Sequence, residues 1–510
     1  MSSIVGQYVN PVIPGFYPDP SICRVGTDYY LVTSSFQYFP GVPIFHSRDL
    51  VHWEQIGHCL NRESQLDLER CRSSMGIYAP TLRFHQGRFF MVTTNMNSRR
   101  NFYVWSETPD GPWSDPIWLD WSGIDPSLFF DDDGRVYLSG TNELGTNEPH
   151  GIYQAEINIE TGQLLTERRL IWNGTGGQAP EGPHMYRVHG KYYLMIAEGG
   201  TEYGHMVTIA RADSPYGPFE SNPGNPILSH RSTNHPIQAT GHADLVQLED
   251  GSWWAVFLGI RPVSVPFVGR HHHLGRETFL APVTWSAEGW PVIGDGGKVT
   301  EKLPVGAEAS LIDKNEFEGN QLQLCWNFLR NPQAGEWSLE ERPGWLTLHG
   351  SATTLNDIGS PAFVGRRQQH FNCSVSTLLS FNPVREGEEA GLTVYMNERF
   401  HYEIALTYNS DTGRKVILRR RIGSLWKVEF EAAVEDSDVI LGLEADPSTY
   451  SFFYAEPNGE RMPFGTAECS LLSTEVAGGF TGVYIGLYAT GNGRHCTVPA
   501  YFDWFDYKSH

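Results

Sequence analysis

The chain of 510 residues is long enough for two to four domains, and with 40% apolar residues it can bury a sizeable core. Its 37 basic and 59 acidic side chains leave a net charge of −22, which disfavours binding to nucleic acid or to an anionic membrane surface. A 13% aromatic content, 53 glycines and 32 prolines, without long helix-forming stretches, predict an all-β protein.

Targeting and redox features of the chain are few. The first residues lack the basic and apolar regions of a signal peptide, and no stretch approaches about 18 consecutive apolar residues. The seven cysteines are an odd number without a CxxC pair, which indicates neither a disulfide framework nor a zinc site. We therefore expect a cytoplasmic protein without a membrane span.

The first 300 residues contain a layout that recurs five times. Each copy has a short polar-to-apolar stretch, a Gly or Asp turn, an aromatic or apolar doublet and an apolar strand, as in DPSICRVGTDYYLVTSS and EGPHMYRVHGKYYLMIA. The copies begin at Asp19, Ala79, Asp125, Glu181 and His242, with spacings of 60, 46, 56 and 61 residues. Repeats of this length with about four short strands predict a five-bladed β-propeller. The alternative is an irregular β-sandwich whose hairpins are alike by chance.

The repeat ends after residue 300, where a charged, glycine-spotted segment follows. We place the domain boundary near residue 310, which gives a propeller at residues 1–310 and a second domain at 311–510. The second part alternates apolar and polar residues in runs such as HFNCSVSTLLSF, FHYEIALTYN and GVYIGLYAT. Such half-buried antiparallel strands, in a segment of this size, predict a β-sandwich.

The starting residues of the repeats are candidates for a functional site. Equivalent positions of the blades lie at equivalent places around the axis of a propeller. If the innermost strands begin there, three carboxyl groups and the imidazole of His242 share one end of the central channel. Neighbouring carboxylates raise one another's pKa, which costs stability and is usually retained for function. Taken singly, Asp19, Asp125 and Glu181 also fit turns, and His242 fits a buried core histidine.

Aromatic and cationic residues flank this ring in the sequence. Phe36 and Tyr78 belong to aromatic stretches next to the repeat starts. Aromatic faces beside carboxylates suit a sugar ring, although each aromatic also fits ordinary core packing. Arg276 in GRETFLAPV is a candidate donor to sugar hydroxyls or to a carboxylate, or part of a structural ion pair. Paired carboxyl groups across a cavity suggest glycoside hydrolysis, in which one protonates the leaving oxygen and the other activates water.

The motifs NPVIPGFYPDPSICRVGTDYYLVTSS, GIYAPTLRF, GIDPSLFF, APEGPHMYRVHGKYYLM and ATGHADLV together resemble glycoside hydrolase family 43. The similarity is greatest to its two-domain β-xylosidases and α-L-arabinofuranosidases. It implies a five-bladed propeller whose pocket is capped by a β-sandwich of the jelly-roll, concanavalin-like type. It also implies an inverting, exo-acting enzyme that releases terminal β-D-xylose, α-L-arabinofuranose or both from hemicellulose-derived oligosaccharides.

The resemblance assigns a role to each motif residue. Asp19 in PDPS corresponds to the general base, Glu181 in APEGPH to the general acid, and Asp125 in GIDPS to the residue that orients Glu181 and holds its pKa up. The remaining positions contact the sugar: Phe36 and Tyr78 wall the pocket, His242 lies beneath the sugar, Arg276 contacts the substrate, and Phe480 in GGFTG closes the pocket from the sandwich domain. Many relatives have Trp at the position of Tyr78.

Some matters stay open in the sequence. Acid–base hydrolysis requires no cofactor, but some members of the family hold a hydrated calcium ion near the residue that corresponds to His242. A non-catalytic carbohydrate-binding propeller and a retaining fructan-type hydrolase are the rival functions. Retention needs two carboxyl groups about 5–5.5 Å apart and inversion about 6.5–9.5 Å. Whether the chain forms a homo-oligomer is also open.

The histidine run 271–273 is predicted to be a loop feature beside Arg276, since consecutive positions of a strand cannot all face one ion.

Overall fold

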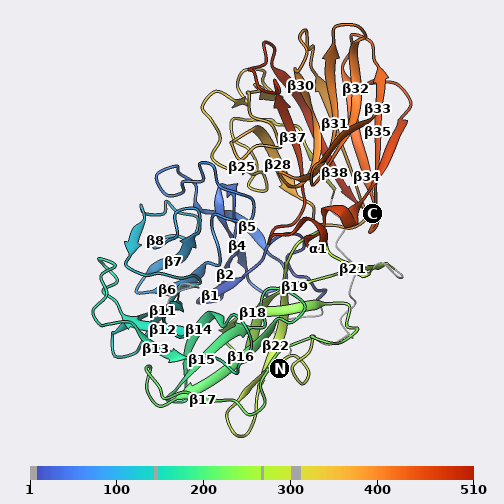
Figure 1. Cartoon of the computed structure of the whole chain (residues 1–510). Helices are drawn as coiled ribbons and strands as arrows, with labels where there is room; N and C mark the ends of the chain where they lie inside the picture. Colours follow the sequence, from blue (N-terminus) through green and yellow to red (C-terminus); the bar gives the residue numbers. More distant parts are fainter. Residues whose placement is uncertain (1–7, 143–146, 266–268, 300–311) are drawn as a thin grey trace.

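The computed structural model describes residues 8–142, 147–265, 269–299 and 312–510. The chain forms two β-sheet domains, with the C-terminal domain above the N-terminal one in Figure 1. Within the described residues the helical elements are a 3-10 turn at Cys469–Leu472 and the single-turn helix α1 at Thr474–Ala477. The prediction of an all-β protein is confirmed. No helix of the described ranges is long and apolar enough to cross a membrane.

The N-terminal domain consists of five antiparallel sheets of four strands each. The first sheet is β1 (Ser21–Val25), β2 (Asp28–Val32), β4 (Gly41–Ser47) and β5 (Glu54–Leu60). The second is β6 (Thr81–His85), β7 (Arg88–Asn95), β8 (Arg100–Ser106) and β9 (Ile117–Leu119). The third is β10 (Ser127–Phe130), β11 (Val136–Thr141), β12 (Ile152–Glu156) and β13 (Arg169–Trp172). The fourth is β14 (Glu181–Val188), β15 (Lys191–Glu198), β16 (Met206–Ala212) and β17 (Glu220–Ser221). The fifth is β18 (Gln238–Gln247), β19 (Trp253–Ile260), β22 (Glu277–Trp285) and β23 (Pro291–Ile293). Between β19 and β22 in the sequence, β20 (Val263–Val265) and β21 (Gly269–His271) form a separate two-stranded sheet.

The first strands of the five sheets form a closed ring. Strand β1 packs beside β6, β6 beside β10, β10 beside β14, β14 beside β18, and β18 again beside β1. The hairpins that follow turn at the predicted glycines, which have positive φ in every blade: Gly26, Gly87, Gly134, Gly190 and Gly251. The five-bladed propeller predicted from the repeat is therefore confirmed.

The repeat starts lie at three different places relative to their strands. Asp19 and Asp125 precede β1 and β10 by two residues, whereas Glu181 is the first residue of β14. His242 lies in the middle of β18, because two register shifts between Gln238 and Asp244 interrupt the pairing of β18 with β19. The expectation that each innermost strand begins at the repeat start is thus met only at Glu181. The bulged start of β18 nevertheless brings His242 level with the other repeat starts at the cavity described below.

A polar network joins the innermost strands of all five blades. Asp244 accepts hydrogen bonds from Ser21 Oγ at 2.7 Å and from Arg83 Nη1 at 2.8 Å. Arg83 Nη2 also contacts His184 Nδ1 at 2.9 Å, and Ser127 Oγ contacts the same nitrogen at 3.2 Å. Each of these five side chains comes from a different blade, so the network crosses the axis of the propeller and links the blades to one another.

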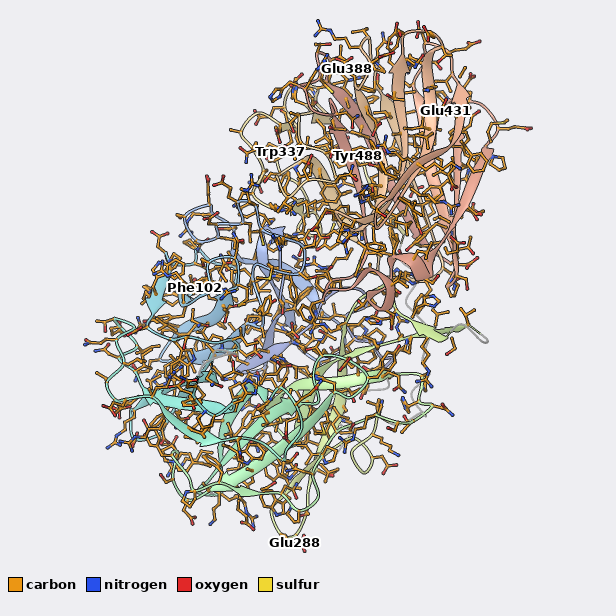
Figure 2. The ribbon with its side chains drawn as sticks, viewed as in Figure 1. Phe102, Glu288, Trp337, Glu388, Glu431 and Tyr488 are labelled. Carbon is orange, nitrogen blue, oxygen red and sulfur yellow. The ribbon has the colours of Figure 1, made fainter. Side chains whose placement is uncertain are left out.

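The C-terminal domain is a sandwich of two antiparallel sheets. One sheet has the order β28 (Ala362–Arg367), β37 (Tyr484–Thr490), β30 (Glu389–Asn397), β31 (Phe400–Asn409), β32 (Gly413–Ile422) and β33 (Leu425–Ala433). The other has the order β26 (Trp337–Ser338), β27 (Leu346–Leu348), β38 (Ala500–Ser509), β29 (Cys373–Ser380), β34 (Val439–Ala445), β35 (Thr449–Ala455) and β36 (Met462–Glu468), and β24 (Ile312–Asn315) also pairs with β38. Buried side chains of both sheets form one apolar core. Figure 2 places Tyr488 within this domain and Phe102 within the propeller.

The two domains share a hydrogen-bonded and packed interface. The two-residue strand β25 (Phe328–Leu329) of the C-terminal segment pairs with β3 (Tyr38–Phe39) of the propeller. The buried guanidinium of Arg367 donates from Nε to the Phe16 carbonyl at 2.6 Å. These contacts hold the sandwich against the segment before β1 and the segment after β2. The boundary predicted near residue 310 lies outside the described residues, so the division into 1–310 and 311–510 stays a prediction.

Candidate active site

One cavity of the propeller contains every residue that the sequence singled out as a candidate. The space not filled by atoms is about 380 Å³, its open mouth included. Its lining consists of Asp19, Phe36, Tyr78, Ala79, Ile124, Asp125, Glu181, Thr201, His242, Arg276 and Phe480. All five repeat starts are among these residues, and Phe480 comes from the sandwich domain. The ring predicted from blade equivalence is thus present, with the small side chain of Ala79 at the second blade.

Three of the ring residues have the same unusual backbone conformation. The φ angles of Asp19, Asp125 and His242 are 54°, 55° and 49°, in the left-handed region that non-glycine residues seldom adopt. Such a conformation costs of the order of 1–3 kcal/mol at each position and tends to cluster at functional sites. The conformation thus recurs at three of the five repeat starts, all of which line the cavity.

Asp19 is buried among donors that stabilise its charged form. Arg276 Nη1 donates to Oδ1 at 2.6 Å, and the Ser34 hydroxyl donates to Oδ2. His242 Nδ1 lies 3.8 Å from Oδ1. Burial by itself would raise the pKa of Asp19, but the charge of Arg276 and these hydrogen bonds outweigh it and hold the pKa below its usual value of 3.8. The group is therefore an ionised carboxylate at neutral pH.

Glu181 and Asp125 have the opposite environment. Burial raises the pKa of Glu181 to about 7, and the negative charge of Asp19 adds to the rise. The pKa of Asp125 is also raised, first by burial and then by the charges of Glu181 and Asp19. Two carboxyl groups that interact in this way resist ionising together, so the pair retains a proton near neutral pH.

Asp125 also fixes the backbone on which Glu181 stands. Its Oδ2 accepts a hydrogen bond at 3.1 Å from the backbone N–H of Gly182, the residue that follows Glu181. A Cβ on Gly182 would lie 2.9 Å from the ring of His242, and φ there is 58°. Both observations explain why glycine follows the glutamate in this motif, and the hydrogen bond to Asp125 fixes the backbone next to Glu181.

Aromatic rings wall one side of the cavity. Phe36 lies 5.2 Å from Tyr78 and 6.3 Å from Phe480, measured between ring centroids, and the rings of Phe36 and Phe480 are stacked. Arg276 lies over both of these stacked rings and donates from Nη2 to the Phe480 carbonyl at 3.4 Å. Phe480 is 41% exposed, so its ring is available to a ligand in the cavity. A sugar ring finds here apolar faces beside charged and polar groups.

The surroundings of His242 do not form a cage for a metal ion. Its side chain is buried between Asp19 and the backbone of Gly182, and burial lowers its pKa, so the imidazole is neutral. Calcium takes about six to eight oxygen ligands. Among the residues that the structure describes, no group of three or more His, Cys, Asp or Glu side chains is arranged to hold an ion. These residues therefore do not fit a calcium ion held by protein ligands, and we derive no chemical step through one.

Two residues that touch the carboxyl groups escaped sequence reasoning. Ser34 bonds to Asp19, and Thr201 donates from Oγ1 to Glu181 Oε1 at 3.3 Å. Both lie just after the second strand of a blade, and Ser34 is part of the repeat copy DPSICRVGTDYYLVTSS. The equivalence of the loops that follow these strands is the signal that could have indicated them. The histidine run 271–273 was predicted to be a loop feature beside Arg276. His272 and His273 do lie in a loop, and His272 lines a cavity together with Arg276, but His271 is the last residue of β21. All three side chains are buried. His272 bonds to Glu475 of the sandwich domain, so the run is an interdomain contact.

The five-bladed propeller and its carboxyl-lined cavity indicate a β-propeller hydrolase that acts on sugars. The comparison with known proteins agrees with this class. The model described as "Glycosyl hydrolases family 43" matches residues 8–291, and that described as "Beta xylosidase C-terminal Concanavalin A-like domain" matches residues 314–508. The chain therefore belongs to glycoside hydrolase family 43 and is a glycosidase.

Similar proteins match over nearly the whole chain. A "Non-reducing end alpha-L-arabinofuranosidase" of Bacteroides ovatus is 46% identical over 98% of this chain and 94% of its own length. A "Xylosidase/arabinosidase" of Butyrivibrio fibrisolvens is 40% identical over 95% of this chain and 96% of its own length. A solved structure, "xylan beta-1,4-xylosidase" from Bacillus halodurans, superposes with a TM-score of 0.92 at 35% identity and covers 99% of this chain and 100% of that chain. The fold and the family expected from the motifs are confirmed.

Proposed function

We propose that the protein is an exo-acting, inverting glycosidase that releases terminal β-D-xylose, α-L-arabinofuranose or both from hemicellulose-derived oligosaccharides. Relatives that match over nearly the whole chain have names that cite arabinofuranosidase activity, xylosidase activity or both. A cavity of about 380 Å³, mouth included, suits one pentose unit and a short part of the leaving group.

The opposite pKa shifts of Asp19 and Glu181 in one cavity are the observation that carries this proposal. Asp19 has a lowered pKa and acts as the general base that takes a proton from water. Glu181 has a pKa of about 7 and acts as the general acid. The oxygen of the water bonds to the anomeric carbon as the glycosidic C–O bond breaks. One proton passes from water to Asp19, and one passes from Glu181 to the leaving oxygen. Because water enters from the face opposite the leaving group, the anomeric configuration inverts.

The other cavity residues position the sugar. Asp125 holds the backbone at Glu181 through its hydrogen bond with the Gly182 N–H, and the two carboxyl groups resist ionising together, which keeps a proton in the pocket. Arg276 keeps Asp19 ionised and offers its guanidinium to the sugar hydroxyls. Phe36, Tyr78 and Phe480 stack on the ring, and Phe480 closes the pocket from the sandwich domain, which limits attack to chain ends.

Initial rates on the p-nitrophenyl β-D-xyloside and α-L-arabinofuranoside, with wild type and Glu181→Ala side by side, test the proposal. We expect turnover of at least one substrate by wild type and a lower rate in the variant, with the full loss of about 10²–10⁴-fold on a phenyl glycoside, whose poorer leaving group needs the acid. A binding protein would turn over neither. Proton NMR of the first sugar released separates inversion from retention, since the retaining alternative gives the opposite anomer.

We further propose that the reaction needs no cofactor and that the protein acts in the cytoplasm. Both proton transfers use side chains of the chain itself, and unchanged rates after dialysis against EDTA would support a metal-independent reaction. The cysteines are present as thiols, which supports a reducing compartment. Fractionation of the native host, with activity followed in each fraction, tests the location.

A further inference from the structure

A second cavity lies beside the active-site cavity, where the two domains meet. Its space not filled by atoms is about 530 Å³, its open mouth included, and its lining consists of Thr201, Glu202, Tyr203, Ala239, Ile260, His272, Arg276, Thr474 and Glu475. Thr201 and Arg276 line both cavities, so these two side chains form a shared wall. Glu475 is the charged residue that the sandwich domain contributes to the second cavity, from helix α1.

Three hydrogen bonds from the propeller converge on the Glu475 carboxylate. The backbone N–H of His272 donates to Oε2 at 2.9 Å, and His272 Nδ1 lies 2.7 Å from Oε1. The hydroxyl of Tyr203 donates to Oε1 at 2.9 Å. The Glu475 side chain is 24% exposed and that of His272 10%. Burial by itself would raise the pKa of Glu475, but the hydrogen bonds and charge of His272 outweigh it and place the pKa at about 2. The carboxylate is therefore a permanently charged anchor between the domains.

Two chains of contacts, called arms below, lead from the Glu475 carboxylate into the active site. The first arm leads to the proposed general acid. Tyr203 and Thr201 belong to the turn after β15, in which the His205 backbone N–H donates to the Glu202 carbonyl at 2.9 Å. His205 Nδ1 also contacts the Gly200 carbonyl at 2.6 Å. These bonds make the turn compact, so a displacement of Tyr203 also displaces Thr201, two residues away. Thr201 in turn bonds to Glu181 at 3.3 Å.

The other arm leads to the ring that closes the pocket. Helix α1 ends at Ala477, and Gly478, Gly479 and Phe480 follow directly, with φ angles of 73° and 86° at the two glycines. The Phe480 backbone N–H donates to Ser74 Oγ at 2.8 Å. The two glycines at positive φ make the segment conformationally permissive. It is held at Phe480 by this bond and by Arg276 Nη2, which donates to the Phe480 carbonyl at 3.4 Å. The Glu475 carboxylate fixes the helix from which the segment starts.

We propose that Glu475 is a positioning residue of the active site, through which the sandwich domain holds both the Thr201 contact to Glu181 and the Phe480 ring. The inference rests on the proposed function, since it takes Glu181 as the acid. Glu475 does not line the active-site cavity, and it acts through Tyr203 in one arm and through helix α1 in the other. The sandwich domain thereby contributes to proton transfer as well as to the shape of the pocket.

Two variants separate the arms. Glu475→Gln keeps the shape of the side chain and removes the charge that both arms share. Tyr203→Phe removes one hydrogen bond and leaves the His272 contacts in place. Glu460→Gln is the matched control, because Glu460 is an exposed glutamate in a turn of the same domain. Rates are measured on phenyl and 2,4-dinitrophenyl glycosides of the preferred pentose, since only the poorer leaving group, phenol, needs the acid.

We expect Glu475→Gln to lower kcat roughly tenfold on the phenyl glycoside, since small displacements of catalytic groups have large effects. On the dinitrophenyl glycoside kcat should fall less than about twofold. The variant should also raise KM on both substrates. Tyr203→Phe should reproduce the leaving-group effect with KM unchanged. Equal losses on both substrates that follow a lower melting temperature would show a purely structural role and overturn the inference, as would wild-type kinetics in both variants.

Failure of the proposed function has a different signature. If Glu181→Ala itself shows no dependence on the leaving group, then Glu181 is not the acid, and the positioning role of Glu475 is overturned together with that assignment. If Glu181→Ala shows the dependence and Glu475→Gln does not, the proposed function stands and only the inference is wrong.

Discussion

Arg276 and Asp19 form a buried pair in which Nη1 donates to Oδ1 at 2.6 Å, and each side chain is less than 10% exposed. The second terminal nitrogen of the same guanidinium reaches the Phe480 carbonyl. The proposed base, the cation that keeps it ionised and the closing residue of the other domain are therefore linked through one planar group. Since a guanidinium stays protonated at any working pH, the link is permanent.

The pair predicts a change at the acidic side of the pH profile. The base must be ionised to accept a proton, so activity falls as the pH drops through the pKa of Asp19, which lies below 3.8. In Arg276→Gln the main stabilising charge is gone, and we expect the acidic limb of kcat/KM to move up by about 1–3 pH units. Arg270→Gln, outside the cavity, is the control and should leave the limb in place. An unshifted limb in Arg276→Gln would contradict the assignment of Asp19 as base.

The raised pKa of Glu181 predicts the basic side of the pH profile. The acid must be protonated, so kcat/KM of the wild type should fall as the pH rises through about 7, the pKa of Glu181. Asp125→Asn keeps an oxygen for the Gly182 N–H and leaves in place burial and the charge of Asp19, which raise this pKa. We therefore expect the basic limb of the variant to stay near pH 7. The pH profiles of both proteins decide the matter, and a limb that moves well below 7 in the variant would show that the charge of Asp125 is needed to hold the pKa of Glu181 up.

Phe480 predicts a separation of binding from chemistry. The ring is 41% exposed and stacks on Phe36, so Phe480→Ala removes a wall of the pocket without opening the core. Loss of one aromatic contact of about 0.5–1.5 kcal/mol should raise KM by roughly 2- to 12-fold. We expect kcat to change less than KM. Phe430→Ala, which removes a 46% exposed ring elsewhere in the same domain, is the control. Equal KM values for the two variants would show that Phe480 does not contact the sugar.

Sequence reasoning located the blades and the ring because both depend on local signals. A turn glycine seven to nine residues after each repeat start indicates the hairpin of every blade, and the five copies reinforce one another. The carboxyl groups Asp19, Asp125 and Glu181 came together because equivalent residues of a closed ring must be neighbours. The predicted strand start was right only at Glu181, since β1, β6 and β10 begin two residues after their repeat starts. At His242 the strand begins earlier, because the bulges in β18 depend on its pairing with β19 and leave no local pattern.

Contacts between the domains could not be predicted in the same way. The resemblance to relatives indicated Phe480, but nothing in its surroundings did. The carboxylate of Glu475 meets Tyr203 across 272 positions of the chain, and no periodicity connects the two. Such pairs result from the way the finished domains dock, and a single sequence contains no record of that docking. The lowered pKa of Asp19 could not be predicted either, since it depends on Arg276, which is 257 residues away in the sequence.

The polar network across the propeller axis predicts where the fold is most sensitive. Asp244 accepts hydrogen bonds from Ser21, Arg83 and the Tyr186 hydroxyl, the last at 2.7 Å. Burial alone would raise the pKa of Asp244, but the charge of Arg83 outweighs it and holds the pKa far below the usual 3.8. Because the folded-state pKa is the lower one, the network stabilises the fold at every pH above about 4 and loses this effect as the pH falls below 3.8.

Asp244→Asn tests this role of the axis. The variant leaves Arg83, whose side chain is 17% exposed, without its counter-charge. Breaking such a buried pair typically lowers the free energy of unfolding by about 3–5 kcal/mol, whereas Glu160→Gln, which breaks an exposed pair with Arg88, should lower it by less than about 1 kcal/mol. Urea unfolding at pH 7 and pH 3 measures both variants. The difference between Asp244→Asn and wild type should shrink at pH 3, since the wild type then begins to lose the charge of Asp244 in the unfolded chain. A deficit that is small at pH 7, or equal at both pH values, would mean that the blades are held together by their apolar contacts and not by the charges on the axis.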